Sequence, residues 1–152
     1  MNPTIRRMTE ADRTAVMHMM QVFYTSPAVH TNGSEVIFTA DIDACVGDSP
    51  YLEGYVFEDE NAILVGYAML AKSFSTEFGK PCIWIEDLYL TPDARGLGLG
   101  GQFFTLIHEV YPDAVFRLEV EEDNEPAVHL YRKKGYGTLP YMEMIKLPNS
   151  EE

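Results

Sequence analysis

The amino-acid sequence predicts an α/β fold, a mixed β-sheet flanked by helices, and three observations support this. The chain has 152 residues, of which 46% are hydrophobic and 12% aromatic, values typical of one folded domain with a buried core. Short apolar or alternating segments, typical of strands, are interspersed with segments whose apolar residues recur at helical spacing. The sequence contains no repeat, low-complexity tract or Pro/Gly/Ser-rich linker, so we expect a single domain over residues 1–152.

The N-terminal half predicts a strand, two helices and a hairpin, in that order. The strand spans 4–8, and Thr9 opens the first helix because Thr9 and Asp12 have nearly the spacing of a capping box. The break at 26–33 separates this helix from a second, shorter one at 35–46. Two strands, 51–57 and 62–72, then flank an acidic turn and form a hairpin.

The C-terminal half predicts three strands, at 82–90, 115–120 and 141–147, with a helix in each interval, at 102–111 and 124–135. Strand 82–90 is apolar enough to be central. In the last helix, Asn124 is the expected N-cap, Pro126 lies in the first turn, and Gly135 ends the helix. The complete order, β-α-α-β-β-β-α-β-α-β, is typical of helices packed on a mixed sheet.

Charge and cysteine content limit the classes of protein. A net charge of −13 disfavours binding to nucleic acid or an anionic membrane and favours cationic ligands, although solubility explains it equally well. No apolar run approaches the ~20 residues of a membrane helix, and we expect no secretory signal because the first residues lack an apolar core. Cys45 and Cys82 form no CxxC pair, so we expect a cytoplasmic protein without a metal site.

The segment RGLGLGG (95–101) has four glycines in seven positions and lies between a predicted strand and a predicted helix. A glycine-rich turn that enters a helix leaves several backbone N–H groups unpaired, and together they form an anion site. The segment lacks the Lys-Ser or Lys-Thr of a Walker A loop. It also has the wrong third spacing for a dinucleotide fingerprint, and the chain is too short on both sides of it for a Rossmann fold.

The segment Arg95–Gly100 does match [Q/R]xxGx[G/A], the acyl-CoA pyrophosphate loop of GCN5-related N-acetyltransferases, the GNAT superfamily. The segments GYAM (66–69), IWIEDLYL (83–90) and NEPAVHLYRKKGY (124–136) match further motifs of that superfamily in order and spacing, so the resemblance covers most of the chain. Within the superfamily, the chain most resembles diamine (spermidine/spermine) N-acetyltransferases. The resemblance implies a mostly antiparallel sheet with about four helices, acyl-CoA bound between splayed central strands, and a homodimer, since family members often dimerise.

The resemblance also implies direct transfer of acetyl from acetyl-CoA to a primary amine, and the acidic composition would suit a di- or polyamine. The amides of residues 96–101, with Arg95 as charge partner, would bind the pyrophosphate. The pantetheine arm would pair with the strand edge at Leu88 and Leu90, and the Leu88 amide would face the developing oxyanion. The full expected set for the co-substrate is Leu88, Tyr89, Leu90, Arg95, Gly96, Leu97, Gly98, Leu99, Gly100, Gly101, Asn124, Ala127 and Tyr131.

Two residues are candidates for proton transfer. Tyr131 is the expected general acid for the leaving thiolate, although by helical spacing alone it would extend the apolar stripe of its helix. Glu86 is the expected base for the amine. Neighbouring side chains of a strand point to opposite faces, so Glu86 and Asp87 cannot both face the acceptor without a bulge. The rival interpretation is a buried carboxylate paired with an arginine. The expected acceptor-binding residues are Tyr24, His30, Glu86, Asp87 and Glu122.

Other functions fit part of the pattern. The acceptor could be another amine, such as a lysine analogue, a protein N-terminus or an aminoglycoside. A non-catalytic CoA-binding module would share the glycine loop but would release no thiol. A nucleotide-binding module would bind NAD or ATP and would be indifferent to CoA.

Overall fold

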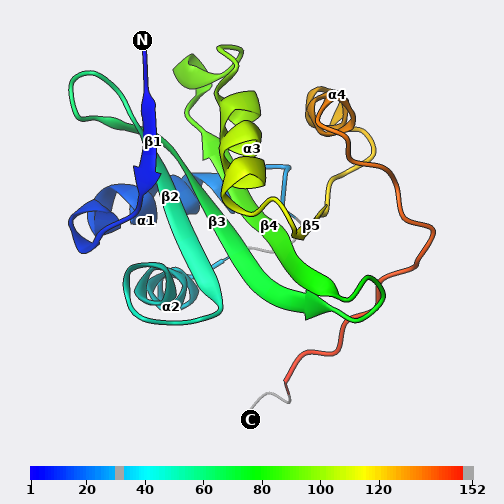
Figure 1. Ribbon diagram of the computed structural model, residues 1–152. Helices are drawn as coiled ribbons and strands as arrows, with labels where there is room; N and C mark the ends of the chain where they lie inside the picture. Colours follow the sequence, from blue (N-terminus) through cyan, green and yellow to red (C-terminus); the bar gives the residue numbers. More distant parts are fainter. Residues whose placement is uncertain (30–32, 149–152) are drawn as a thin grey trace.

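The computed structural model describes residues 1–29 and 33–148, and its centre is one sheet with strands in the order β1-β2-β3-β4-β5 (Figure 1). The strands are β1 (Thr4–Arg7), β2 (Leu52–Glu58), β3 (Leu64–Ser75), β4 (Lys80–Leu90) and β5 (Val115–Leu118). The first three pairings are antiparallel and the pairing of β4 with β5 is parallel. The expected mixed, mostly antiparallel sheet is therefore confirmed.

Four α-helices cover the sheet in the described part of the chain, as the family resemblance implied. They are α1 (Arg13–Phe23), α2 (Glu35–Val46), α3 (Leu99–Val110) and α4 (Glu125–Lys133). Short 3₁₀ turns at Glu10–Asp12 and Pro92–Ala94 precede α1 and α3. The backbone N–H of Thr9 donates to Asp12 Oδ2 at 2.8 Å, so the expected capping interaction starts this helical region.

The two faces of the sheet have separate cores. On one face, α1 and α2 bury Met20, Phe38 and Ile42 against Tyr67 and other sheet residues. On the other face, α3 buries its own apolar stripe, which includes Phe103 and Phe104, against the sheet. In Figure 1, α3 lies over the middle of the sheet, and α4 lies beyond the β5 edge. The sheet, with the end of β4, therefore has α1 and α2 on one face and α3 on the other.

The pairing of β4 with β5 covers only four residue pairs, from Cys82↔Val115 to Ile85↔Leu118. Strand β4 continues to Leu90, paired on its other side with β3. Beyond Ile85 the two parallel strands part, and this edge of β4 has no strand partner among the described residues. The strand separation that the family resemblance implied is thus present.

The expected strand 141–147 is wrong. This segment follows α4 as an extended stretch outside the sheet, and no described strand pairs with it. Figure 1 shows it running past the far end of the β3–β4 hairpin, away from the edge of β5. Its side chains alternate in a way that suits a strand, but alternation forms a strand only where a neighbouring edge supplies backbone hydrogen bonds.

No helix in the described ranges is long and apolar enough to span a bilayer.

Candidate active site

The free edge of β4 presents backbone donors. The amide of Thr91 donates to the carbonyl of Val65, at the end of the β3–β4 ladder. Because amides alternate in direction along a strand, those of Leu90 and Leu88 point away from β3, towards the side on which β5 has parted. The carbonyl of Leu90 faces the same side, since it accepts Arg95 Nε at 3.0 Å. Leu88 and Leu90 therefore have the orientation expected for an edge that binds an extended ligand.

The glycine loop has the backbone of an anion site. Gly96 and Gly98 have φ values of +76° and +82°, a left-handed conformation that side chains rarely adopt. Gly98 is the N-cap of α3, and the first helical bond runs from Gln102 N to Gly98 O. Within the described chain, the backbone amides from Gly96 to Gly101 have no acceptor, so they are available to an anion at the helix N-terminus.

The last two glycines of the loop, Gly100 and Gly101, serve helix packing rather than the loop conformation. The sequence alone does not distinguish these two roles. A Cβ at Gly100 would lie 3.1 Å from Leu130 Cδ2, and one at Gly101 would lie 3.4 Å from Lys134 Cε. Gly100 and Gly101 therefore allow α4 to pack closely against the first turn of α3. This packing brings the C-terminal end of α4 next to the loop.

Lys134 and Lys133 add positive charge beside the loop. They line a shallow groove of about 470 Å³ together with Gly98, Gly101 and Thr105. Lys134 Nζ donates to Thr105 Oγ1 at 3.1 Å. These lysines could not be assigned to the site from the sequence, because the close contact of α3 with α4 depends on tertiary packing. The signal that could have found them is the basic run at the end of the helix.

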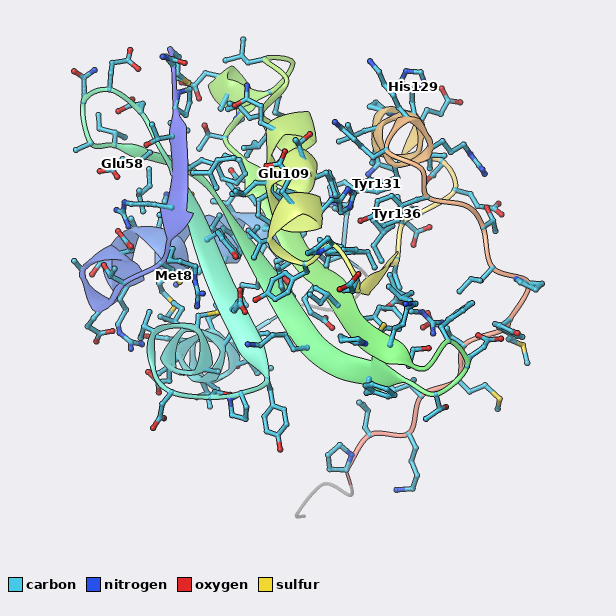
Figure 2. The ribbon with its side chains drawn as sticks, in the orientation of Figure 1. Met8, Glu58, Glu109, His129, Tyr131 and Tyr136 are labelled. Carbon is cyan, nitrogen blue, oxygen red and sulfur yellow. The ribbon has the colours of Figure 1, made fainter. Side chains whose placement is uncertain are left out.

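Tyr131 lies on α4 between that helix and α3 (Figure 2), while His129 on the same helix points away from the molecule. The ring of Tyr131 packs edge-to-face on Phe104, with 5.5 Å between the ring centroids, and Tyr136 packs on the same phenylalanine. Burial raises the pKa of Tyr131 above its usual range. No described hydrogen bond engages its hydroxyl, so the side chain is at once part of the core and free to donate a proton.

The structure gives the positions of the other predicted residues of α4 and the loop. Asn124 occupies the N-cap position of α4, but its side chain makes no capping hydrogen bond. Ala127 is partly buried on the same helix. The Arg95 guanidinium lies 5.8 Å from the ring centroid of Tyr89. Leu97 is exposed, and Leu99 is buried in the α3 core.

A β-bulge in β4 directs both carboxylates of the Glu86-Asp87 pair to one face. Met69 pairs with Asp87 and Leu70 pairs with Ile85, so Glu86 is the extra residue. Before the bulge, Ile85 packs in the core with α3, and after it Leu88 packs against the same core, three positions later. The inserted residue turns Glu86 and Asp87 towards the α1–α2 side. This is the arrangement that the sequence analysis named as the condition for both to face an acceptor.

Glu86 is exposed to solvent, yet other acids surround it. Neighbouring atoms partly shield the Glu86 carboxyl from water. This desolvation, together with the negative charges of Asp87 and Glu143, raises the pKa of Glu86 above its usual range. A carboxylate with a raised pKa is a better proton acceptor than an ordinary one. The position of Glu86, beside the free edge of β4, therefore suits a base.

Asp87 is 4% exposed and accepts two tyrosine hydroxyls, from Tyr24 at 2.9 Å and from Tyr67 at 2.7 Å. Burial raises the pKa of Asp87. The rival interpretation, a buried carboxylate paired with an arginine, is wrong in its partner: Asp87 is buried, but tyrosine hydroxyls donate to it in the described residues. Through this bond, Asp87 fixes Tyr24, which follows α1, against the end of β4.

Asp41 on α2 is a further acid on this side of the sheet, and the sequence analysis missed it. Burial and the charges of Asp87 and Glu86 raise the pKa of Asp41 to about 6. Its signal in the sequence was weak, because an aspartate in a helix is most often a solvated residue.

Glu122, which follows β5, stays a predicted acceptor-binding residue. Glu119, which directly follows β5, lies near two other acids: Glu143 and burial raise the pKa of Glu119, and Glu86 adds to this effect. Glu122 is exposed, and no described contact joins it to the site. His30 lies outside the described residues. No group of three or more His, Cys, Asp or Glu in the described ranges is arranged to hold a metal ion.

Residues 14–136 match the model of the Acetyltransferase (GNAT) family, and the chain belongs to this family. The resemblance found in the motifs is therefore confirmed.

The curated relatives and solved structures agree with this assignment. The chain is 35% identical over 89 residues to thialysine N-epsilon-acetyltransferase of Sus scrofa. The matched stretch covers 57% of this chain and 52% of that protein. The mouse protein of the same name is 33% identical over the same length. The chain thus spans about half the length of these curated relatives.

Two solved structures share the fold. A possible acetyltransferase from Clostridium difficile 630 has a TM-score of 0.80 at 17% identity, with 97% of this chain and 99% of that chain covered. AAC(6')-Iy, solved in complex with the bisubstrate analogue CoA-S-monomethyl-acetylneamine, has a TM-score of 0.77 at 11% identity, with 98% and 100% covered.

Proposed function

We propose that the protein is an N-acetyltransferase that moves acetyl from acetyl-CoA to a primary amine by direct attack in a ternary complex. One observation supports the proposal. The outward amides of Leu88 and Leu90 and the carboxylate of Glu86 belong to one short stretch of β4, and the glycine loop with its free amides follows the end of that strand. A donor and an acceptor held at that stretch would lie on either side of the same strand.

The donor side supplies backbone groups and positive charge. The amides from Gly96 to Gly101, at the positive end of α3, would bind the pyrophosphate, with Arg95 and Lys134 as cationic partners. The amides of Leu88 and Leu90 would bind the pantetheine arm as an added strand. The fit is supported by the loop itself, because its amides lack acceptors and its glycines carry no side chain that would block an anion.

The reaction that these groups support is balanced in protons and electrons. Glu86, directly or through water, accepts the ammonium proton, since an alkylamine has a pKa of about 10.4 and attacks only when neutral. The nitrogen lone pair forms the new C–N bond at the thioester carbon, and the Leu88 amide stabilises the oxyanion. The C–S bond then breaks with its electron pair on sulfur, and Tyr131 gives that sulfur a proton. The nitrogen, which carries one surplus proton after the attack, releases it to water, and the Tyr131 phenolate takes a proton back from water, so the only net product proton is the one that Glu86 accepted and later releases.

The acceptor side is acidic, which supports a cationic substrate. Glu86, Asp41 and Glu119 lie around the end of β4, and each carboxyl has a raised pKa. Burial and the neighbouring Asp87 raise the pKa of Glu86 and of Asp41, and Glu143 together with burial raises that of Glu119. A second cationic group on the acceptor would relieve this repulsion. We propose a di- or polyamine as acceptor. The relatives named for thialysine support a lysine analogue as a second candidate, which has the same pairing of an amine with another charged group.

A panel of amines tests the function. Purified protein is incubated with acetyl-CoA and putrescine, spermidine, thialysine, lysine or an aminoglycoside, and free thiol is measured. We expect turnover with at least one diamine-type acceptor and little thiol release without amine. Thiol release with none of the amines, despite measurable CoA binding, would replace this proposal with a non-catalytic CoA-binding module. Binding of NAD or ATP with indifference to CoA would indicate a nucleotide-binding module.

We propose further that the protein works in the cytoplasm as a homodimer. The reducing compartment is supported by Cys45 and Cys82, which are both free thiols and both buried. The dimer is supported by the apolar side chains that the C-terminal segment exposes.

A further inference from the structure

His108 and Tyr136 form a hydrogen-bonded pair that the proposed mechanism does not use. His108 lies on α3, and its Nε2 is 3.0 Å from the hydroxyl of Tyr136, which directly follows Gly135 at the end of α4. Both side chains are half-buried. Burial and the charge of Lys134 lower the pKa of His108, so its imidazole is neutral at neutral pH. A neutral imidazole nitrogen either accepts the tyrosine proton or donates its own, so both tautomers keep this bond.

The end of α4 ties Tyr136 to Tyr131. The amide of Tyr136 donates to the carbonyl of Tyr131, and the amide of Gly135 donates to that of Arg132, both at 3.0 Å. With the left-handed φ of +96° at Gly135, these bonds form a Schellman motif, which folds the residue after the glycine back onto the last turn of the helix. The two tyrosine rings lie 6.2 Å apart between centroids, in the space between α3 and α4 (Figure 2). The backbone therefore holds the Tyr136 ring beside that of Tyr131.

Helix α3 supplies the other half of this support. Phe104 is fully buried and packs edge-to-face against both tyrosine rings, at 5.5 Å between centroids in each case. One turn further along α3, His108 packs on Phe104 and on Phe116. Helix α4 contains no buried residue. Contacts with α3, rather than a core within α4, therefore set where Tyr131 lies.

The hydroxyls of the two tyrosines differ in their partners. The hydroxyl of Tyr136 is engaged by His108, whereas no described hydrogen bond engages that of Tyr131. The Tyr131 hydroxyl is the proposed acid, and a catalytic group has to be held within about 0.5 Å of its productive position. Because Tyr131 lacks a hydrogen bond that would orient it, its neighbours have to fix the ring.

We propose that His108 and Tyr136 are positioning residues for Tyr131: His108 anchors Tyr136 to α3, and Tyr136 holds the Tyr131 ring in the orientation from which it protonates the leaving thiolate. No described ring contact or hydrogen bond joins His108 to Tyr131, so its effect passes through Tyr136 and Phe104. The catalytic consequence rests on the acetyl transfer proposed above. The pair adds no step to that reaction, because neither residue exchanges a proton with the substrates.

Steady-state kinetics, with an amine that the panel identifies, test this consequence. Tyr136→Phe removes one oxygen and leaves the ring on Phe104. We expect kcat to fall about 10- to 100-fold, a loss that a small misplacement of a catalytic group can cause, with an unchanged KM for acetyl-CoA. In the Tyr131→Phe background the same change should leave kcat unaltered, because the hydroxyl that it positions is absent. A general loss of structure would lower kcat in both backgrounds.

Two matched comparisons separate positioning from stability. Tyr55→Phe also removes a tyrosine hydroxyl bond from the core, the bond to Glu53, and should lower the free energy of unfolding while kcat keeps its wild-type value. His108→Gln retains a hydrogen-bonding group near the position of Nε2 and should keep most of the turnover. His108→Leu has a similar size but no such group, and it should lose as much turnover as Tyr136→Phe.

Nuclear magnetic resonance of protein with carbon-13-labelled tyrosine tests the positioning without any turnover. The ring signal of Tyr131, assigned from Tyr131→Phe, should shift in His108→Leu and stay near its wild-type position in His108→Gln. Both variants lack the imidazole ring, so the hydrogen bond is what distinguishes them. If the wild type releases no thiol with any amine, the proposed transfer fails, and this measurement still decides whether His108 positions Tyr131.

Three results would overturn the positioning even in an active enzyme. The first is a Tyr131 signal that is unchanged in His108→Leu, or shifted equally in both His108 variants. The second is a further fall of kcat when Tyr136→Phe is added to Tyr131→Phe. The third is a loss of kcat in Tyr55→Phe as large as that in Tyr136→Phe.

Discussion

Two neighbouring acids of β4 have different functions because a β-bulge inserts one extra residue into this strand. The bulge at Glu86 turns two adjacent carboxylates to one face, but they meet different surroundings. Asp87 is buried under two tyrosine hydroxyls and supports Tyr24, whereas Glu86 stays accessible at the open edge. A pair of neighbouring acids therefore provides one positioning residue and one candidate base.

Replacement of Tyr131 by phenylalanine tests the proposed acid. The ring would still pack on Phe104, so folding and acetyl-CoA affinity should change little, while turnover should fall about 10²–10⁴-fold, the usual range for a general acid. Steady-state kinetics and a direct measurement of acetyl-CoA binding check this. Tyr51→Phe, at an exposed tyrosine, is the control and should behave as the wild type. An unchanged rate in Tyr131→Phe would remove this residue from the mechanism.

Replacement of Glu86 by glutamine tests the proposed base. In the wild type, kcat/KM should rise with pH as Glu86 loses its proton, at a pH above the usual glutamate range because its pKa is raised. In Glu86→Gln, the reaction would depend on amine that is already neutral, so the profile should move towards the amine pKa of about 10.4. The pH dependence of kcat/KM is the measurement. Glu109→Gln, on the exposed side of α3 (Figure 2), should keep the wild-type profile. An unaltered profile in Glu86→Gln would exclude the base function.

At the scale of elements, the glycine loop combines two requirements in seven residues. Gly96 and Gly98 supply left-handed turns that expose amides, and Gly100 and Gly101 admit α4 against α3. The left-handed turns at Gly96 and Gly98 create the anion site. The helix packing that Gly100 and Gly101 allow brings Lys134 to it. Loop conformation and helix packing are therefore coupled.

Replacement of Gly98 by alanine separates these requirements. A Cβ would meet nothing within 4 Å at Gly98, so the cost comes only from its φ of +82°. We expect a loss of about 1–2 kcal/mol in the free energy of unfolding and a lower affinity for CoA, measured by denaturant unfolding and calorimetry. Gly137→Ala is the control, because Gly137 also has open space around it but no left-handed φ. Equal effects of the two substitutions would show that the loop conformation is not what binds the anion.

Most elements could be predicted because each carries its own signal. The β2–β3 hairpin has its turn residues, α4 has Gly135 at its end with φ +96°, and α3 has its apolar stripe. Strand 141–147 could not be judged in the same way, because a strand also needs a partner edge. The bulge was foreseen only as a condition, since it becomes visible when Ile85 and Leu88 pack in the same core. The bonds from Tyr24 and Tyr67 to Asp87 join residues distant in sequence.

At the scale of the whole molecule, the cluster of acids around the end of β4 should reduce stability in favour of binding. Asp41, Glu86 and Asp87 lie on one side of a sheet in a chain of net charge −13. Like charges held together by the fold repel each other, and the cost appears as raised pKa values of their carboxyls. Such sites are commonly the least stabilising part of an enzyme.

Replacement of Asp41 by asparagine measures this cost. The pKa of Asp41 is about 6 in the folded protein, and about 3.9 in an unfolded chain. The folded state therefore binds more protons between these values, and wild-type stability falls as pH rises through this window. Asp41→Asn should be more stable by up to about 3 kcal/mol above pH 6, with the difference vanishing towards pH 4. Denaturant unfolding across this range is the test, with Asp113→Asn, at an exposed aspartate, as control. A difference independent of pH would contradict the charge explanation.

The short ladder between β4 and β5 has a mechanical consequence. Among the described residues, the only strand pairs that join β5, and the last quarter of the chain with it, to the sheet run from Cys82↔Val115 to Ile85↔Leu118, and α4, which packs on α3, contains no buried residue. We therefore expect β5 and α4 to open as a unit while the β1–β4 meander stays closed, so their amides should exchange with deuterium well before those of β2 and β3. Hydrogen-exchange mass spectrometry would detect this order. Local opening of β5 and α4 would let the proposed product leave the site while the remainder of the molecule stays folded.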